Sequence, residues 1–253
     1  MVVRLVQMRV KPGRMAEFQR FYEEHIIPAL EGVTGCRSTA LAQNIQRDEE
    51  LISLTVWDSA QHSSAYERGG MYANLIARSK PYFIEGDEWH LQLGDDAQLE
   101  LAPVVEEPVV KSYSNVDVQA SQPSTGSQVS FMFLRMVKMV LRPGMEEEFQ
   151  RVYEEIVRPE LLRLGGCRGA FVVRDLDHKS DWVSMTIWDR KEDADRHEEG
   201  GSSTRLRAKL SPYLSGLYQW KRGLDKDLGK QAITSEDVSV TGYRVMTGKR
   251  LID

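Results

Sequence analysis

The chain is poor in cysteine, in net positive charge and in long apolar runs. Its 253 residues carry a net charge of −5 and two cysteines, Cys36 and Cys167, whose spacing fits no metal or redox motif. A nucleic-acid-binding protein needs a basic stripe, whereas here Lys and Arg are scattered and mostly adjoin Asp or Glu. No apolar run approaches the ~20 residues of a membrane span. We expect a globular cytoplasmic protein without a nucleic-acid or membrane partner.

Cofactor motifs are also missing from the sequence. It contains neither a GxGxxG nor a P-loop pattern, and its five histidines include no His-x-x-x-His set beside an acid. The N-terminal run MVVRLVQMRV has charges within it, unlike a secretory signal. The sequence therefore predicts no metal site and is compatible with a reaction that uses no cofactor.

What the chain does contain is an internal repeat. The run LTVWDSAQHSSAYERGG (54–70) returns as MTIWDRKEDADRHEEGG (185–201), and the offset that places Arg4 on Arg135 overlays about ninety positions without a gap. Between 4–37 and 135–168, 17 of 34 pairs are identical. We therefore expect one repeat at 1–100, a linker with a possible extra strand at 101–130, and a second repeat with a C-terminal tail strand at 131–253.

Hydrophobic patterns within the first repeat predict alternating strands and helices. An alternating strand stops at Pro12-Gly13, an amphipathic helix covers 14–31 with a kink at Pro28, and two strands follow. Asp58 is the expected N-cap of a helix over 59–68, which Gly69-Gly70 ends. A second helical piece (71–79) and the run EWHLQL (88–93), the expected fourth strand, complete the unit. Each tail, at PVVKSYSNV and VSVTGYRV, predicts a further short strand.

The order βαββαβ is that of a ferredoxin-like unit, so the fold class is α+β. A four-stranded sheet with helices on one face leaves its other face bare. We expect the two repeats to cover each other's bare faces and form an intramolecular α/β barrel with its helices outside. A monomer and a homodimer of such chains both remain possible.

The repeated motifs resemble a known family. PG…EFQRFYEEHIIPALEGVTGCR followed by ISLTVWDSAQHSSAYERGG, and their second copies, are similar to the antibiotic biosynthesis monooxygenase (ABM) domain. The resemblance covers most of both repeats and implies the dimeric α/β barrel fold. It also implies a monooxygenase that needs no flavin, haem or metal and uses O₂ to oxidise a small phenol, anthrone or quinol.

Candidate site residues follow from the helix faces and strand ends. His25 lies on the apolar helix face where the other repeat has Ile156, so it is a candidate general base. With Tyr66 as a holder of a substrate oxygen and Trp57 as a pocket wall, it makes up the expected catalytic set. The expected substrate-binding residues are Tyr22, His62, Arg4, Trp188, His197 and Tyr153. Each also has a purely structural interpretation, as a core anchor, an ion-pair partner or a solvated residue.

Two alternatives to an oxygenase are open. Related ABM-type domains degrade haem with an Asn, a Trp and an iron-binding His, but the aligned positions are Val6, Tyr66 and Leu75 in one repeat and Val137, His197 and Leu206 in the other. The second alternative is a non-catalytic binding or stress-related protein. Because candidate positions differ between the repeats while turn and core residues agree, we expect one active pocket, in the first repeat.

Overall fold

The computed structural model describes residues 1–93, 99–105, 108–115, 132–215 and 238–251. The first repeat contains β1 (Val2–Arg9), α1 (Met15–Phe21), the π-helical turn η1 (Tyr22–Ile26), α2 (Ile27–Glu31), β2 (Cys36–Asn44), β3 (Glu50–Trp57), α3 (Ala60–Arg68), α4 (Met71–Ser79) and the 3₁₀ turn η2 (Lys80–Tyr82). Three further strands follow it: β4 (Glu85–Leu93), β5 (Leu99–Val105) and β6 (Val109–Asn115).

The second repeat has the same order of elements. It contains β7 (Phe133–Val140), α5 (Glu146–Val152), the π-helical turn η3 (Tyr153–Val157), α6 (Arg158–Leu162), β8 (Cys167–Asp175), β9 (Asp181–Trp188), α7 (Lys191–Glu199), α8 (Ser202–Leu210), the 3₁₀ turn η4 (Ser211–Tyr213) and β10 (Val238–Arg250). The last part of the expected linker, 116–130, lies outside the described residues.

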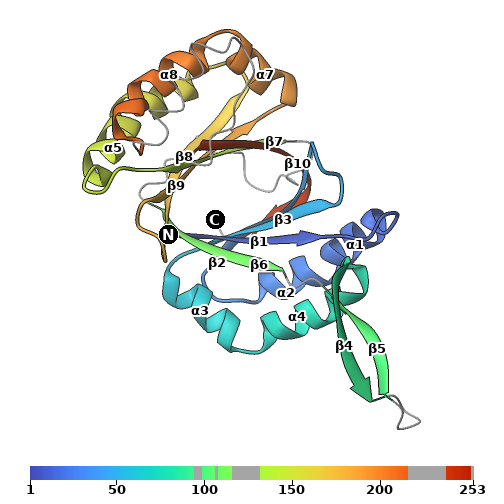
Figure 1. Cartoon of the computed structure of the whole chain (residues 1–253). Coiled ribbons are helices and arrows are strands. Elements are labelled where there is room, and N and C mark those ends of the chain that lie inside the picture. The colour runs from blue at the N-terminus through green and yellow to red at the C-terminus, as the bar shows by residue number, and fades with distance from the viewer. Residues whose placement is uncertain (94–98, 106–107, 116–131, 216–237, 252–253) are drawn as a thin grey trace.

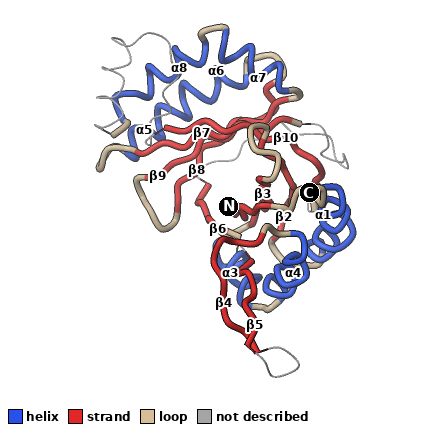
Figure 2. Tube along the Cα trace, turned by 45° about the vertical axis from the view of Figure 1, so that its right-hand side comes forward, coloured by secondary structure: helices blue, strands red, loops and turns tan. Residues whose placement is uncertain are grey.

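Eight strands form one closed antiparallel barrel in the order β1-β3-β2-β10-β7-β9-β8-β6. The helices of each repeat pack on the outside, on opposite sides of the barrel (Figures 1 and 2). The expected tandem ferredoxin-like units and the intramolecular α/β barrel are confirmed. No described helix has the length and apolar character that crossing a membrane requires.

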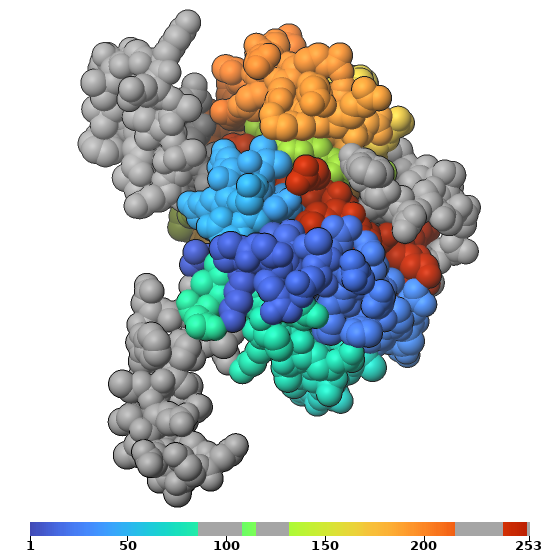
Figure 3. Space-filling model, turned by 90° about the vertical axis from the view of Figure 1, so that its right-hand side faces the viewer, coloured from blue at the N-terminus to red at the C-terminus, as the bar shows by residue number. Residues whose placement is uncertain are grey.

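The two tail strands join the repeats. Strand β6 pairs with β1 of its own repeat and with β8 of the other, and β10 likewise pairs with β7 and β2. Figure 3 shows part of β10, in red, at the surface between the blue first repeat and the orange second repeat. Each repeat therefore completes the hydrogen bonding of the other's sheet edge.

The prediction for the fourth strand is wrong in its location. Residues 88–93 do form a strand, but β4 pairs with β5 in a separate two-stranded hairpin that projects from the barrel (Figure 1). The fourth place in the sheet belongs to the tail strand β6, and to β10 in the second repeat. Both runs alternate apolar and polar residues, and local patterning cannot decide which one pairs with a distant strand.

Alternation along β1 divides its side chains between two environments. Val3 and Leu5 point into the barrel, where they join an apolar cluster with residues of the second repeat such as Leu134 and Met136. Arg4, between them, points to the helix side. The barrel interior is thus a packed apolar core, and polar strand residues such as Arg4 lie beneath the helices.

The long helix is interrupted just before its proline. Pro28 lacks an N–H, so the carbonyl one turn earlier loses its usual helical partner. The turn Tyr22–Ile26 has π-helical hydrogen bonding, and Tyr153–Val157 repeats it before Pro159. The predicted kink is therefore a π-helical turn in both repeats, of a kind often found near functional sites.

Helix α3 and its N-cap both lie one residue later in the chain than predicted. Ser59 is the N-cap, and its hydroxyl accepts a hydrogen bond from the backbone N–H of His62. Asp58 instead forms an ion pair with Arg37. The prediction that Asp58 caps the helix is therefore wrong, because its carboxylate is held by the arginine on the neighbouring strand.

Candidate functional site

A cluster of rings and an arginine lies beneath α3 and α4 in the first repeat. Arg4 of β1 donates two hydrogen bonds to one oxygen of Glu67 on α3, at 2.8 and 3.0 Å. Its guanidinium lies 4.2 Å from the ring centre of Tyr72 and 5.8 Å from that of Tyr66. Tyr66 in turn packs on Trp57, with ring centres 5.1 Å apart. Arg4, Trp57 and Tyr66, three of the predicted residues, are thus brought together.

This cluster is nearly closed to solvent. Arg4 is 2% exposed, Trp57 0% and Tyr66 8%. Burial raises the pKa of Tyr66 well above its ordinary value of 10, although the nearby Arg4 acts in the opposite direction. At neutral pH Tyr66 is therefore a neutral phenol that can donate a hydrogen bond, and it cannot act as a phenolate base.

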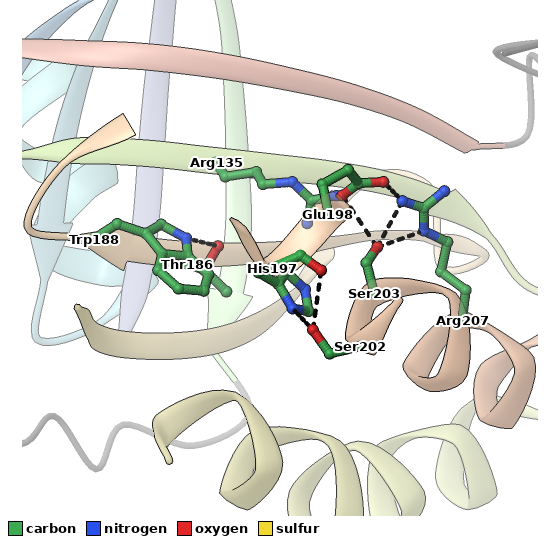
Figure 4. Close-up of polar contacts among 8 residues, drawn as sticks. All are labelled: Arg135, Thr186, Trp188, His197, Glu198, Ser202, Ser203 and Arg207. Atoms are coloured by element: carbon green, nitrogen blue, oxygen red, sulfur yellow. Dashed lines mark hydrogen bonds and ion pairs between the residues drawn. The ribbon is translucent and has the colours of Figure 1, made fainter. Parts of the chain in front are cut away.

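The matching cluster in the second repeat is more polar (Figure 4). Arg135 of β7 donates a 2.5 Å hydrogen bond to Glu198, and the Ser203 hydroxyl donates a 3.0 Å bond to the same carboxylate. Arg207 of α8 forms an ion pair with Glu198 and donates hydrogen bonds of 2.6 and 3.0 Å to Ser203. His197 stacks on Trp188, with ring centres 5.6 Å apart.

The hydrogen bonds around His197 define its tautomer. The single hydroxyl hydrogen of Ser202 is donated to the backbone carbonyl of His197 at 2.9 Å. The 2.7 Å contact between Nδ1 and Ser202 Oγ therefore needs the imidazole to donate from Nδ1. Burial lowers the pKa of His197 from 6.5 to about 4, with Arg135 and Arg207 contributing. At neutral pH it is therefore an uncharged ring whose Nε2 carries the acceptor lone pair.

Arg135 supplies a buried positive charge. It is 9% exposed, and burial lowers its pKa from 12.5 to about 10. The guanidinium remains cationic at neutral pH. Beside a tryptophan wall and a neutral imidazole, such a cation can stabilise a phenolate, an enolate or a reduced oxygen species.

The structure places the other predicted histidines elsewhere. His25 is half-buried and meets the edge of Phe21, with ring centres 5.0 Å apart. The ring of His62 lies over Gly35, and its Nδ1 is 3.1 Å from Ser59 Oγ at the start of α3. Among the described contacts, none joins either histidine to Arg4 or Trp57. His25 lies in η1 and His62 in the first turn of α3, outside the cluster.

Tyr22 and Tyr153 anchor the π-helical turns to the sheet. The Tyr22 hydroxyl is 2.5 Å from Thr39 Oγ1 and 2.8 Å from Ser53 Oγ. Tyr153 donates to the carbonyl of Phe171 at 3.0 Å and lies 2.8 Å from Ser184 Oγ. Both tyrosines are at most 1% exposed, and burial raises the pKa of Tyr22 to about 12. Their hydroxyls are engaged in holding helix to strand.

The sequence did not reveal every member of either cluster. In the first repeat it did not select Glu67 and Tyr72, and in the second it left Glu198, Ser203 and Arg207 aside. One signal was present: Glu67 and Glu198 occupy equivalent positions in the two repeats, as do Arg4 and Arg135. An acid and a base kept in both copies predict a repeated ion pair.

Metal-binding clusters and open hollows are the other kinds of site that a fold can offer. The described residues contain no group of three or more His, Cys, Asp or Glu side chains that could hold a metal ion. A hollow of about 360 Å³ lies between the repeats, lined by residues that include Gln43, Asp48, Phe133, Arg190 and Arg244. None of the predicted site residues lines it.

The fold and the clusters define a class: a tandem α/β barrel whose two units each place an arginine and a tryptophan under their outer helices. Among solved structures, a "putative monooxygenase" from Lactobacillus acidophilus aligns with 99% of this chain and 96% of its own, at 8% identity and a TM-score of 0.66. An "anthrone oxidase-like protein" aligns with 100% and 94%, at 10% identity and a TM-score of 0.58. At these identities the similarity establishes the fold.

The family follows from the sequence model that matches the chain. The model for "Antibiotic biosynthesis monooxygenase" matches residues 1–78 and again 132–209, more than half of the protein. The chain belongs to this family and carries two copies of its domain. No curated protein sequence matches the chain.

Proposed function

We propose that the protein is a cofactor-independent monooxygenase that oxidises a small, electron-rich phenol, anthrone or quinol with O₂. With an anthrone, the ring CH₂ becomes a carbonyl: the substrate gives up four electrons and two protons, one oxygen atom enters the product and the other leaves as water. Substrate and O₂ alone balance this reaction. It begins with loss of a proton from the substrate, which yields an oxyanion-stabilised carbanion that reduces O₂.

One observation carries this proposal: each repeat holds a buried arginine beside a tryptophan-ring stack. In the first repeat these are Arg4 with Trp57 and Tyr66, and in the second Arg135 with Trp188 and His197. The flat rings suit an aromatic substrate, and the guanidinium suits the oxyanion that forms when the substrate loses its proton. Family membership supports the same reaction class.

We further propose that the protein works in the cytoplasm. The supporting observation is that Cys36 and Cys167 are both free and buried, because free thiols are typical of a reducing compartment. Substrate and O₂ are the partners. The repeats pair within the chain, and a homodimer of whole chains is compatible with this arrangement.

Oxygen consumption by the purified, metal-free and flavin-free protein tests the proposal. Anthrones, dihydroxynaphthalenes and hydroquinones form the panel, and haemin binding followed by absorbance is the parallel control. We expect saturable uptake above the buffer rate. Arg135→Gln should lower kcat/KM by about 10- to 100-fold, since a charge that stabilises an anionic transition state is worth about 1.4–3 kcal/mol.

The same assay separates the roles of the histidines. If His25 is the base, His25→Ala lowers the rate, and unchanged uptake would remove it from the mechanism. Absence of uptake over the whole panel, with specific binding of the same compounds, would favour the non-catalytic binding protein. A haem absorbance shift would instead favour haem binding.

A further inference from the structure

The two clusters share a frame and differ at three positions. The arginine, glutamate and tryptophan are the same in both repeats, as are the threonines that accept the indole N–H at 2.8 Å, Thr55 and Thr186. The three differing pairs, which occupy equivalent positions in the repeats, are Tyr66 and His197, Tyr72 and Ser203, Ile76 and Arg207. At each position the first repeat has the bulkier or less polar side chain.

In the first repeat, Tyr72 fills the space beside the arginine. Its ring lies 4.2 Å from the Arg4 guanidinium and 5.8 Å from the ring of Tyr66, so Arg4 lies against two aromatic rings and pairs with Glu67. Only 2% of Arg4 remains exposed. A cation with its face covered by tyrosine and its edge bound to a carboxylate has little left to offer an oxyanion.

In the second repeat, Ser203 occupies the position equivalent to Tyr72. Ser203 is small and takes part in the Glu198 network, and Arg207 adds a second cation that is 39% exposed. Arg135 is 9% exposed against 2% for Arg4. Arg135 and Arg207 both bind Glu198 here, whereas the first repeat has the apolar Ile76 at the position equivalent to Arg207. His197 places a neutral imidazole, with a lone pair on Nε2, where the first repeat has the phenol of Tyr66.

We propose that only the second repeat carries the working site, where Arg135 and Arg207 hold the acidic oxygen of the aromatic ligand, and that Tyr72 occupies the corresponding space in the first repeat. The proposal rests on the proposed function for the class of ligand, an aromatic phenol or enol. The residues that distinguish the sites are Ser203 and Arg207. This assignment differs from the first-repeat pocket favoured by the sequence, since His25 and His62 lie outside the cluster.

Binding stoichiometry tests it, with 1-naphthol as the probe in isothermal titration at pH 8. We expect one site per chain in the unaltered protein. Ser203→Tyr, which installs the residue of the first repeat, should weaken binding at least tenfold. The triple variant Y66H/Y72S/I76R transfers the second repeat's residues to the first and should raise the stoichiometry to two. Circular dichroism and thermal unfolding verify that each variant is folded.

Each result bears on the proposal. Two sites in the unaltered protein, unchanged affinity in Ser203→Tyr, or a folded triple variant that still binds one probe would each overturn it. No binding to the unaltered protein would overturn the ligand class. Binding that follows the expected pattern without O₂ uptake over the panel would leave the site assignment standing while the oxygenase proposal fails.

Discussion

A single imidazole in the second repeat links the site to the stability of the protein. His197 is 5% exposed, and its pKa is lowered to about 4 from 6.5. Below pH 6.5 the unfolded chain takes up a proton at this ring while the folded chain does not, so stability falls as the pH drops from 6.5 towards 4. Its share of the free energy of unfolding should decrease by about 2 kcal/mol between pH 7 and pH 5.

Urea unfolding at the two pH values measures this loss. The control is His197→Tyr, which carries the residue of the first repeat and does not titrate in this range. Its stability should depend on pH less steeply than that of the unaltered protein, by the amount that His197 contributes. Parallel pH dependences of the two proteins would show that His197 titrates normally in the folded state.

The roles of single residues were harder to predict from the sequence than the fold. The stripe containing His25 correctly indicates a helix face, but an apolar neighbour such as Phe21 can hold an imidazole as readily as a substrate can. The predicted residue Arg4 does lie in the cluster, whereas Tyr72 is not among the residues that the sequence singles out. Its importance depends on α4 turning back over β1, a contact between residues far apart in the chain.

At the scale of elements, the turn before β2 depends on a glycine. Gly35 has a φ of +81°, and a Cβ there would overlap the side chain of His62 on α3. Gly13 has nearly the same φ, +80°, with nothing within 4 Å of its Cβ position. Gly13→Ala should cost about 1 kcal/mol of stability from backbone strain alone. Gly35→Ala should cost about 3 kcal/mol or more, because α3 must also move.

Chemical denaturation of Gly13→Ala and Gly35→Ala measures the loss of stability in each variant. Their difference reports the packing of His62 on the turn, since the backbone strain is common to both. Equal losses would mean that α3 is not held against Gly35. In the second repeat, a Cβ on Gly166 would likewise overlap the side chain of Asp193. Because the overlap includes the Cβ of the helix residue in both repeats, His62 and Asp193 can differ while the glycine stays.

The order of elements was readable from the sequence, and their pairing only in part. Pro12-Gly13, Gly69-Gly70 and the constant offset between the copies fixed the turns and the duplication, because these signals are local or repeated. Strand 88–93 was found but assigned to the wrong sheet. Its alternation matches that of β6, and the choice between them is made by contacts with β1 and β8 that no local pattern contains.

At the scale of the whole molecule, neither repeat closes its sheet alone. The inner faces of the two sheets meet in one apolar cluster that includes Leu5, Ile52, Tyr113 and Val183. A fragment of residues 1–115 keeps β1, β2, β3 and β6 but loses this cover. We expect it to form a dimer in which β6 pairs with β2 of the second copy, because β2 is the counterpart of β8.

Sedimentation equilibrium of the fragment tests this expectation. A particle of twice the fragment mass, with far-ultraviolet circular dichroism typical of mixed helix and strand, is the expected result. A folded monomer would show that the sheet is stable with its inner face bare. An unfolded fragment would show that the second repeat supplies contacts that a second copy of the first cannot replace.

The joining of both repeats in one chain has a consequence for how the protein can change over generations. In a dimer of identical chains, every mutation appears twice and alters both sites together. Here each position is encoded once, so Tyr72 and Ser203 can differ while β6 and β10 still bind the halves to each other. Selection can thus keep the barrel in both halves of the chain while the residues beneath α7 and α8 alone become specialised.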